Sequence, residues 1–398
     1  MTPVRYLFGI TSGLLTLGLI VSVSASDGRP GGDDDREHDR DRGRVASGRF
    51  LFEKETFGGN GRTCVTCHTR DTGTISPEES RRRFRRNPSD PLFLHDGSDD
   101  GLGNGATRMQ ADATVLVTIP LPDHVSLADD PAARSVTLRR GVPTTLNTPA
   151  LDPVLMMDGR QPTLAAQALG AIHDHAQALG GPTGPELERL IEFEKSDDFF
   201  SSPALMLYAR HGRVPALPPG RTESEVRGRR FFEDVLDFSD LKHGACATCH
   251  AGPMLNQTNA ALQALVGVPV GTRFQSVLVS EFNAAQNPVH DYVFTNPDGT
   301  QSHVVSPDPG RALISGIGQE TGLFDNVNAF KIPSLWGVAK TAPYFHDNSA
   351  KTLEDVVAHY RNFLLLASDL DGPGPMPPFV DLTPQDEADI VAYMKLLK

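Results

Sequence analysis

The sequence has few cysteines and no surplus of positive charge, and each shortage excludes a class of protein. All four cysteines fall in two Cys-x-x-Cys pairs, so none is left over for a disulfide framework. Lys and Arg number 37 against 50 Asp and Glu, and a net charge of −13 argues against nucleic acid or an anionic membrane as partner. At 398 residues, the chain is long enough for two domains with a core each.

A histidine directly follows each cysteine pair. The two strings are Cys64-Val-Thr-Cys67-His68 and Cys246-Ala-Thr-Cys249-His250. In such a string the cysteines form thioethers with the vinyl groups of a c-type haem, and the histidine becomes the proximal ligand of the iron. A structural zinc site would bring its Cys pairs within about 15 to 20 residues of each other, and a redox dithiol would not carry a trailing histidine twice. The strings therefore predict two covalently bound haems c and redox chemistry.

The first 45 residues contain two segments of unusual composition. Residues 1–25 combine a basic start at Arg5, an apolar run and small residues near Ala25, which predicts a secretory signal peptide, with an uncleaved membrane anchor as the alternative. Residues 26–45 are rich in Gly, Asp and Arg and predict a disordered charged tether. The mature chain is expected to be exported to the periplasm, since haem c is attached outside the bacterial cytoplasm.

Aligning the two haem strings reveals an internal repeat. Aromatic residues precede both cysteine pairs, at 48–53 and at 228–233. Further downstream, the order of Pro, Leu, Asp, Thr and Leu residues in 143–164 returns in 333–353. The repeat predicts a mainly α fold of two tandem cytochrome c-like domains, at 46–215 and 220–398, each with one haem.

The repeat also predicts what covers each haem. After the helix cap Thr352, an apolar stripe at helical spacing turns Tyr360 inward. The first copy starts at Thr163 and has Ala171 in the place of Tyr360, and alanine has no atom that binds iron. The second iron would then be six-coordinate and the first open to peroxide. Two alternatives remain: Tyr360 is an ordinary core residue, or Met376 in a Pro-rich loop ligates the second iron.

Three further segments carry a resemblance to a known family: Met157–Arg160, Leu164–Gly170 and Phe330–Asp347. With the haem strings they resemble the bacterial di-haem cytochrome c peroxidases and, within them, the MauG-like branch that matures a tryptophan-derived quinone cofactor. The resemblance covers most of 46–398, with 72–135 as an insertion. It implies that His68 serves the reactive haem, that His250 serves the electron-transfer haem, and that Tyr360 replaces the methionine ligand of the peroxidases.

The resemblance also implies a peroxide pocket. Gln167 matches a glutamine of that pocket, while Gln177 falls where the family has its acid-base glutamate. Because glutamine cannot transfer a proton, His175 or His173 is the candidate for that role.

Several positions depart from the family pattern. Met157 stands where the family has a tryptophan between the haems. Thr341 and Pro343 match carbonyl donors to an interdomain calcium ion, but the asparagine ligand of that ion falls on Gly141. The acidic string that starts at Asp96 has the spacing of a calcium loop without the closing glutamate, and a solvated turn is the preferred interpretation.

Together these observations predict an exported di-haem peroxidase that reduces hydrogen peroxide at the N-terminal haem and shares the oxidising equivalents with the C-terminal haem. Electrons would come from a periplasmic donor or from an oxidisable side chain of a partner protein. The basic run Arg81–Arg86 is a solvated face or a docking site for an acidic partner. The alternative function is a non-catalytic electron carrier, in which His124, His173 or His175 closes the first iron. The sequence leaves the oligomeric state open.

Overall fold

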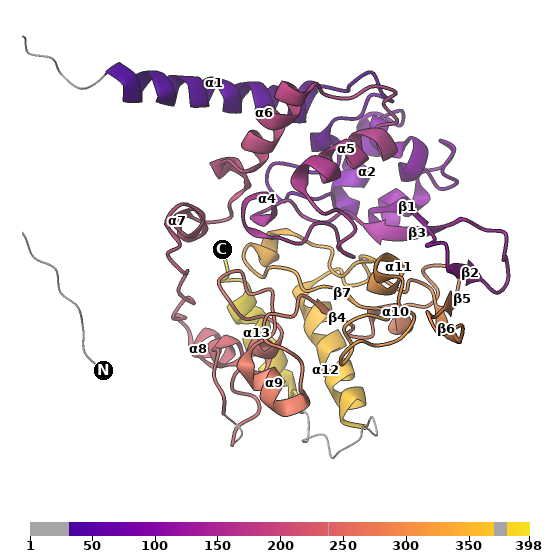
Figure 1. The fold of residues 1–398 in the computed structure, drawn as a ribbon. Helices are drawn as coiled ribbons and strands as arrows, with labels where there is room; N and C mark the ends of the chain where they lie inside the picture. Colours follow the sequence, from indigo (N-terminus) through magenta and orange to yellow (C-terminus); the bar gives the residue numbers. More distant parts are fainter. Residues whose placement is uncertain (1–31, 238, 370–379) are drawn as a thin grey trace, which may run out of the picture. The chain divides into compact units, whose positions relative to one another are not determined.

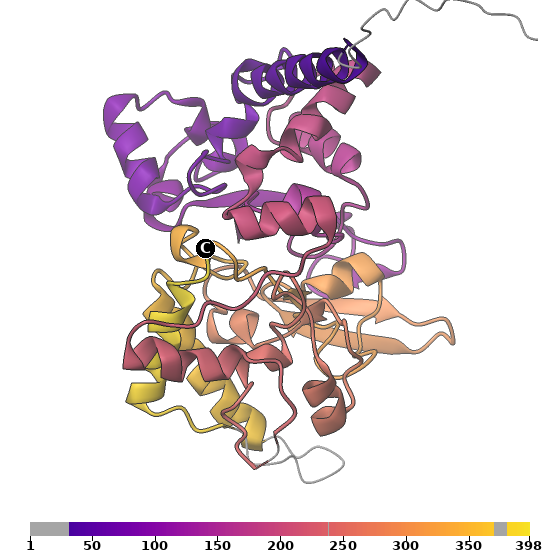
Figure 2. The same cartoon turned by 90° about the vertical axis from the view of Figure 1, so that its left-hand side faces the viewer.

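The structure is a computed structural model that describes residues 32–237, 239–369 and 380–398. The chain divides into two compact units, Met1–Arg42 and Gly43–Lys398. Both haem strings lie in the second unit, which Figures 1 and 2 show from two sides. The predicted signal peptide and Met376 lie outside the described residues.

Helices make up most of the regular structure, which confirms the prediction of a mainly α chain. Up to His211 the helices are α1 (Gly32–Lys54), α2 (Pro77–Arg86), α3 (Thr107–Asp112), α4 (Thr148–Leu151), α5 (Leu164–Asp174), α6 (Gly184–Glu194) and α7 (Pro203–His211). Beyond it they are α8 (Glu223–Arg229), α9 (Ala260–Val266), α10 (Val279–Phe282), α11 (Arg311–Ser315), α12 (Leu353–Asp369) and α13 (Pro384–Met394). Each haem string forms a single 3₁₀ turn, at Cys64–Thr66 and Cys246–Thr248.

Three small antiparallel sheets accompany the helices. The first joins β1 (Thr114–Pro120) to β3 (Ser135–Gly141), with Thr114 opposite Gly141. The second has the order β2 (Val125–Leu127), β5 (His290–Thr295) and β6 (Gln301–Ser306), and the third pairs β4 (Phe274–Gln275) with β7 (Phe330–Lys331). Side chains alternate between buried and exposed along β3, as a strand with one face on the core requires.

A glycine allows a close helix crossing next to each haem string. A Cβ on Gly48 in α1 would overlap the carbonyl oxygen of Arg189 in α6, and it would lie 2.7 Å from the Cβ of Phe193. In the second copy, a Cβ on Gly228 in α8 would overlap the carbonyl oxygen of Asp389 in α13. The contacted positions lie at the same spacing in both copies, so the two crossings are equivalent and confirm the repeat near both strings.

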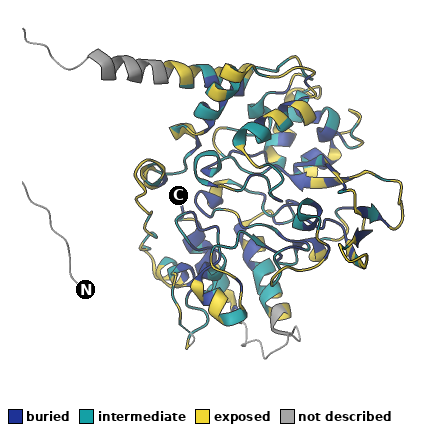
Figure 3. Ribbon diagram, in the orientation of Figure 1, coloured by how far each residue is buried: buried dark blue, intermediate teal, exposed yellow. Residues whose placement is uncertain are grey.

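Buried side chains form three hydrophobic clusters. One surrounds the first string and includes Phe52, Ile172 and Phe193. A second surrounds the next string and includes Phe232 and Tyr393, whose rings lie 5.3 Å apart. The third is built on β1 and β3 together with residues of β5, β6 and α11. Figure 3 shows the buried stretches of β1, β3 and α13 in dark blue.

The N-terminal part of α1 differs from the expected tether. The backbone is helical from Gly32, so residues 32–45 are not a segment without regular structure. Once the aromatic end of α1 is fixed in the core, each added turn needs no new nucleation, and no proline lies between Gly32 and Lys54. Within the described residues, no helix has the length and apolar character needed to span a membrane.

Two candidate haem sites

The two proximal histidines make the same hydrogen bond. Nδ1 of His68 lies 2.8 Å from the carbonyl oxygen of Gly73, and Nδ1 of His250 lies 2.9 Å from that of Leu255. A carbonyl only accepts, so Nδ1 carries the proton in both rings, and Nε2 is the atom that can ligate iron; His250 also has the backbone of Pro333 nearby. Burial lowers the pKa of both imidazoles, which favours the neutral form that ligates iron.

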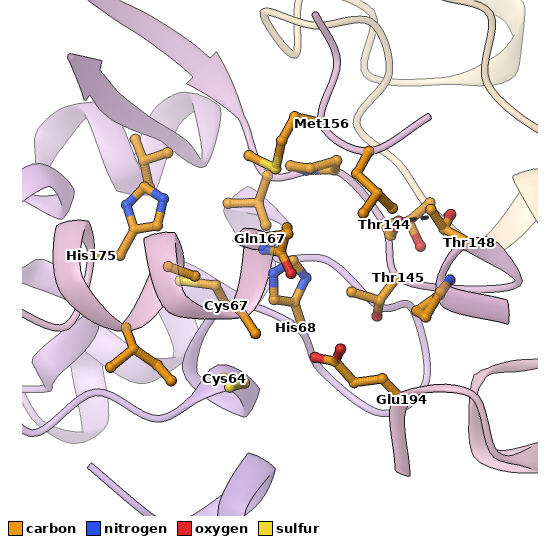
Figure 4. A pocket seen from close by; sticks show the side chains of 18 of the residues that line it. Cys64, Cys67, His68, Thr144, Thr145, Thr148, Met156, Gln167, His175 and Glu194 are labelled. Carbon is orange, nitrogen blue, oxygen red and sulfur yellow. Dashed lines mark hydrogen bonds between the residues drawn. The ribbon is translucent and has the colours of Figure 1, made fainter. Parts of the chain in front are cut away.

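A cavity of about 1390 Å³, counted with its open mouth, adjoins the first string. Its walls include Cys64, Cys67 and His68 together with the inward residues of α5 (Figure 4). It is also lined by Arg160 and Lys331, whose positive charges match the two carboxylates of a haem. Two cysteine thiols outside any disulfide, a neutral imidazole and flanking cations are the groups that a covalent haem requires, so this site fits the predicted cofactor.

His175 reaches this cavity from the end of α5 and is held there by Asp96. Its Nδ1 lies 2.5 Å from Oδ2 of Asp96, a carboxylate with only 4% of its surface exposed. Arg62, two positions before Cys64, forms a buried ion pair with Asp96 and donates to the carbonyl of His175 at 3.1 Å. The three groups thus connect the first haem string, the 90–98 loop and the end of α5.

Arg62 is fully satisfied in this arrangement. Its five N–H groups contact Asp96 and the carbonyl oxygens of Pro91, Leu92, Leu94 and His175. Burial alone would raise the pKa of Asp96, but the hydrogen bond from His175 and the charge of Arg62 bring it below its usual value. Asp96 is therefore charged at neutral pH and accepts a hydrogen bond from Nδ1–H of His175. Nε2 of His175 is then the ring nitrogen without a proton.

The acidic string around Asp96 is not the solvated turn that the sequence suggested. Asp96 itself is buried, because it points inward to Arg62 and His175. The next two carboxylates bind backbone N–H groups of their own loop: Asp99 accepts from Arg108, and Asp100 accepts from Asn104. Nothing in the sequence pattern distinguishes the inward carboxylate from its two neighbours.

The other predicted residues of the first site are divided between the cavity and the surface. Gln167 and Ala171 of α5 line the cavity. Gln177 does not, because its backbone takes a left-handed φ of 53° and its exposed side chain accepts a hydrogen bond from Asn60. His173 is exposed and pairs with its neighbour Asp174, as expected for a surface histidine.

His124, the remaining candidate for a ligand that closes the first iron, is also engaged elsewhere. Its Nε2 lies 2.7 Å from the carbonyl oxygen of Gly316, and it is absent from the cavity walls. Of the three histidines considered, the structure brings only His175 to the cavity.

Tyr360 occupies the corresponding position at the second string. Val356 and Val357 of the same α12 stripe are buried, while His359 turns away and bonds the carbonyl of Val277. Burial raises the pKa of the Tyr360 phenol, and nearby Cys249 adds to the effect. A ferric iron at this position would supply the positive charge that favours the phenolate form.

Glu194 is a functional candidate that the sequence did not indicate. It is the last residue of α6, only 5% of its surface is exposed, and its Oε2 has no hydrogen-bond partner among the described residues. Figure 4 shows its carboxyl group directed into the first cavity. Burial raises the pKa of Glu194 from 4.5 to about 8.

Asn348 lies in the region that was expected to hold calcium. The space beside Gly141 is filled by the carboxamide of Asn348, whose Nδ2 donates to the carbonyls of Asp112 and Ala113. In the described part of the chain, no three His, Cys, Asp or Glu side chains converge as a metal site. Calcium bound through the carbonyls of Thr341 and Pro343 stays a prediction.

The basic run lies on α2, close to the first haem string. Arg83 donates to the carbonyl of Thr66 at 2.7 Å and pairs with Glu79 on its own helix. Phe84 and Cys67 pack against the same hydrophobic cluster, and Arg85 and Arg86 are exposed. The run therefore supports the loop that carries the haem cysteines and also presents charge to solvent.

Comparisons with known proteins find a distant similarity to a cytochrome c peroxidase. No family model matches the sequence. A curated relative, the cytochrome c551 peroxidase of Nitrosomonas europaea, is 24% identical over 227 residues, which cover 54% of this chain and 56% of that protein. The chain thus spans little more than half of that relative.

Two solved structures have a similar chain path. One is a MauG-like protein associated with microbial copper homeostasis, with a TM-score of 0.48 and 19% identity over 89% of this chain and 88% of that one. The other is the diheme peroxidase BthA of Burkholderia thailandensis, with a TM-score of 0.46 and 17% identity over 89% and 86% of the two chains.

The two cysteine–histidine strings, the repeated helix crossings and the paired proximal histidines define a protein built for two c-type haems. Over about half of its length, the chain is similar to a cytochrome c551 peroxidase, in agreement with the resemblance that its motifs indicated.

Proposed function

We propose that the protein is an exported peroxidase that reduces hydrogen peroxide at the haem of His68 and shares oxidising equivalents with the haem of His250. The observation that carries this proposal is the His175–Asp96 pair at the wall of the first cavity. When bound, the haems supply the redox chemistry, and the electrons come from a periplasmic donor or an oxidisable partner side chain. The protein supplies the binding and the proton transfer.

His175 is the proposed acid-base group. Asp96 fixes its Nδ1–H and its ring orientation, so Nε2 is presented to the cavity as a proton acceptor. Nε2 can take a proton from one peroxide oxygen and return it to the other, which leaves as water. Gln167 lines the same cavity, and its amide offers a donor and an acceptor that orient peroxide without moving protons.

The second site is proposed to store charge. Besides His250, Tyr360 is the proposed protein ligand of the second iron. Its phenol lies near both cysteines of the second haem string. An anionic ligand stabilises the oxidised metal and lowers its reduction potential. The absence of an iron-binding atom at Ala171 makes the two irons unequal, because the same helix position offers no ligand at the first site.

The experiment that tests the peroxidase proposal replaces His175 by Gln in the haem-loaded protein. We expect the second-order rate constant for peroxide reduction to fall by about 10²- to 10⁴-fold, the range for loss of a general acid-base group. His173→Gln is the matched control, because His173 lies two residues away and its side chain is 81% exposed. The control should reduce peroxide at the wild-type rate.

Two results would contradict the proposal. Equal rates for His175→Gln and the wild type would remove His175 from proton transfer. A first haem that changes from low spin to high spin in His175→Gln, with faster peroxide binding, would show that His175 ligates the iron, which favours the electron carrier.

A further inference from the structure

The two copies of the repeat contain the same turn before the helix that covers the haem. Leu155 bridges Gln161 in the first copy, and Tyr344 bridges Ala350 in the second, both antiparallel. The partners in each bridge are separated by the same number of residues, and the turns correspond position by position. The residue after each bridge start lies in the left-handed region, with φ of 64° at Met156 and 69° at Phe345. Met156 and Phe345 are therefore equivalent.

The equivalent side chains point to equivalent places. The ring of Phe345 lies 6.3 Å from that of Tyr360, which is near the cysteines of the second string. Met156 lines the first cavity together with Ala171, the counterpart of Tyr360. Figure 4 shows the thioether of Met156 directed into this cavity, toward Gln167.

The two sites place their iron-binding atoms on opposite elements. At the second string the helix offers a phenol and the turn offers only the phenyl ring of Phe345. At the first string the helix offers only the methyl group of Ala171, while the turn offers the thioether of Met156. The side chain with an iron-binding atom therefore stands on the helix in the second copy and on the turn in the first copy.

We propose that the Sδ atom of Met156 ligates the first iron in the resting protein and leaves it when peroxide enters. This inference rests on the haem occupancy assumed in the proposed function, but not on the peroxidase chemistry. A thioether is a soft donor and holds ferric iron weakly, and the side chain of methionine has three rotatable bonds that let it swing aside. Peroxide reduction requires an open iron during turnover, and a displaceable ligand meets that requirement.

The test compares Met156→Leu with Met157→Leu in the full-length, haem-loaded protein. Leucine keeps the volume and removes the sulfur, and Met157 is the matched control because it is the next residue and lines the same cavity. The readouts are the spin state of the first haem by electron paramagnetic resonance, the thioether-to-iron charge-transfer band by magnetic circular dichroism, and the reduction potential of that haem.

We expect the wild type and Met157→Leu to show a low-spin first haem with the thioether band. Met156→Leu should lose both features, become high spin and show a lower reduction potential, because a thioether ligand favours ferrous iron. A high-spin first haem in the resting wild type would overturn the proposal. So would a low-spin signal that persists in Met156→Leu and disappears in Met156→Leu/His175→Ala, because the ligand would then be the imidazole.

Peroxide turnover of the same proteins separates this proposal from the preceding one. A thioether signature that Met156→Leu removes, in a protein that never reduces peroxide, would support the ligand and sink the peroxidase. Peroxide reduction by a wild-type protein that lacks the thioether signature would support the peroxidase and refute ligation by Met156.

Discussion

Replacing Glu194 by Gln should change the stability of the protein in a way that depends strongly on pH. Glutamine has the shape of a protonated glutamate but never ionises, so the variant removes one titration and little else. Glu194 is almost completely buried, and in the part of the chain that the structure describes its Oε2 has no hydrogen-bond partner. The folded protein must therefore bind the proton of Glu194 more tightly than the unfolded chain does.

The size of the effect follows from the two pKa values. The pKa of Glu194 is about 8 in the folded protein against 4.5 for an exposed glutamate. The folded state binds the extra proton between these values, so the wild type is most stable below pH 4.5 and loses stability as the pH rises toward 8. Between pH 5.5 and 7.5 the loss amounts to about 2–3 kcal/mol, while Glu194→Gln loses none of it.

The assay is urea unfolding of both haem-loaded proteins at several pH values, followed by far-ultraviolet circular dichroism. The two proteins should unfold at similar urea concentrations below about pH 4.5, and Glu194→Gln should already be the more stable at pH 5.5, by a margin that grows by about 2–3 kcal/mol up to pH 7.5. Glu188→Gln is the control, because Glu188 lies on the same helix and its side chain is 70% exposed. A stability difference that stays constant with pH, or that favours the wild type more as the pH rises, would refute the reasoning.

Two further predictions concern the second half of the chain. Gly228→Val should destabilise the fold by about 2 kcal/mol or more in urea unfolding, because its side chain would overlap the backbone at Asp389; Gly180→Ala, with open space around it, should change stability by less than about 0.5 kcal/mol, and equal effects would disprove the tight crossing. Tyr360→Phe should raise the reduction potential of the second haem in spectroelectrochemical titration and leave the first unchanged; an unchanged potential would point instead to Met376.

Local patterns in the sequence were sufficient to predict the haem strings, the repeat and the inward direction of Tyr360. The strings depend on adjacent residues, and the caps act within one helical turn: Thr163 accepts from Ala166, and Thr352 accepts from Asp355. The helical period then fixes which side chains face inward, since positions three and four apart share a face. Such features need no knowledge of distant contacts.

The second group of site residues depends on distant contacts and could not be predicted in this way. Asp96 and His175 are 79 positions apart, and nothing near either residue marks the other as a partner. Met156 enters the cavity because its backbone is left-handed, a conformation uncommon for a side chain that carries a Cβ. Glu194 ends an amphipathic helix, where sequence alone favours a solvated carboxylate over a buried one.

The shared turn at Met156 and Phe345 also indicates how a duplicated cofactor domain can diversify. The scaffold around each haem keeps the same bridge, the same left-handed residue and the same covering helix, so the direction of two side chains is inherited with the backbone. With the ligands proposed above, substitution at only those two positions would give one copy a firm anionic ligand and the other a soft, displaceable one. The division of labour between the two halves therefore requires no rearrangement of the fold, and either half could be converted toward the other by exchanging a pair of residues.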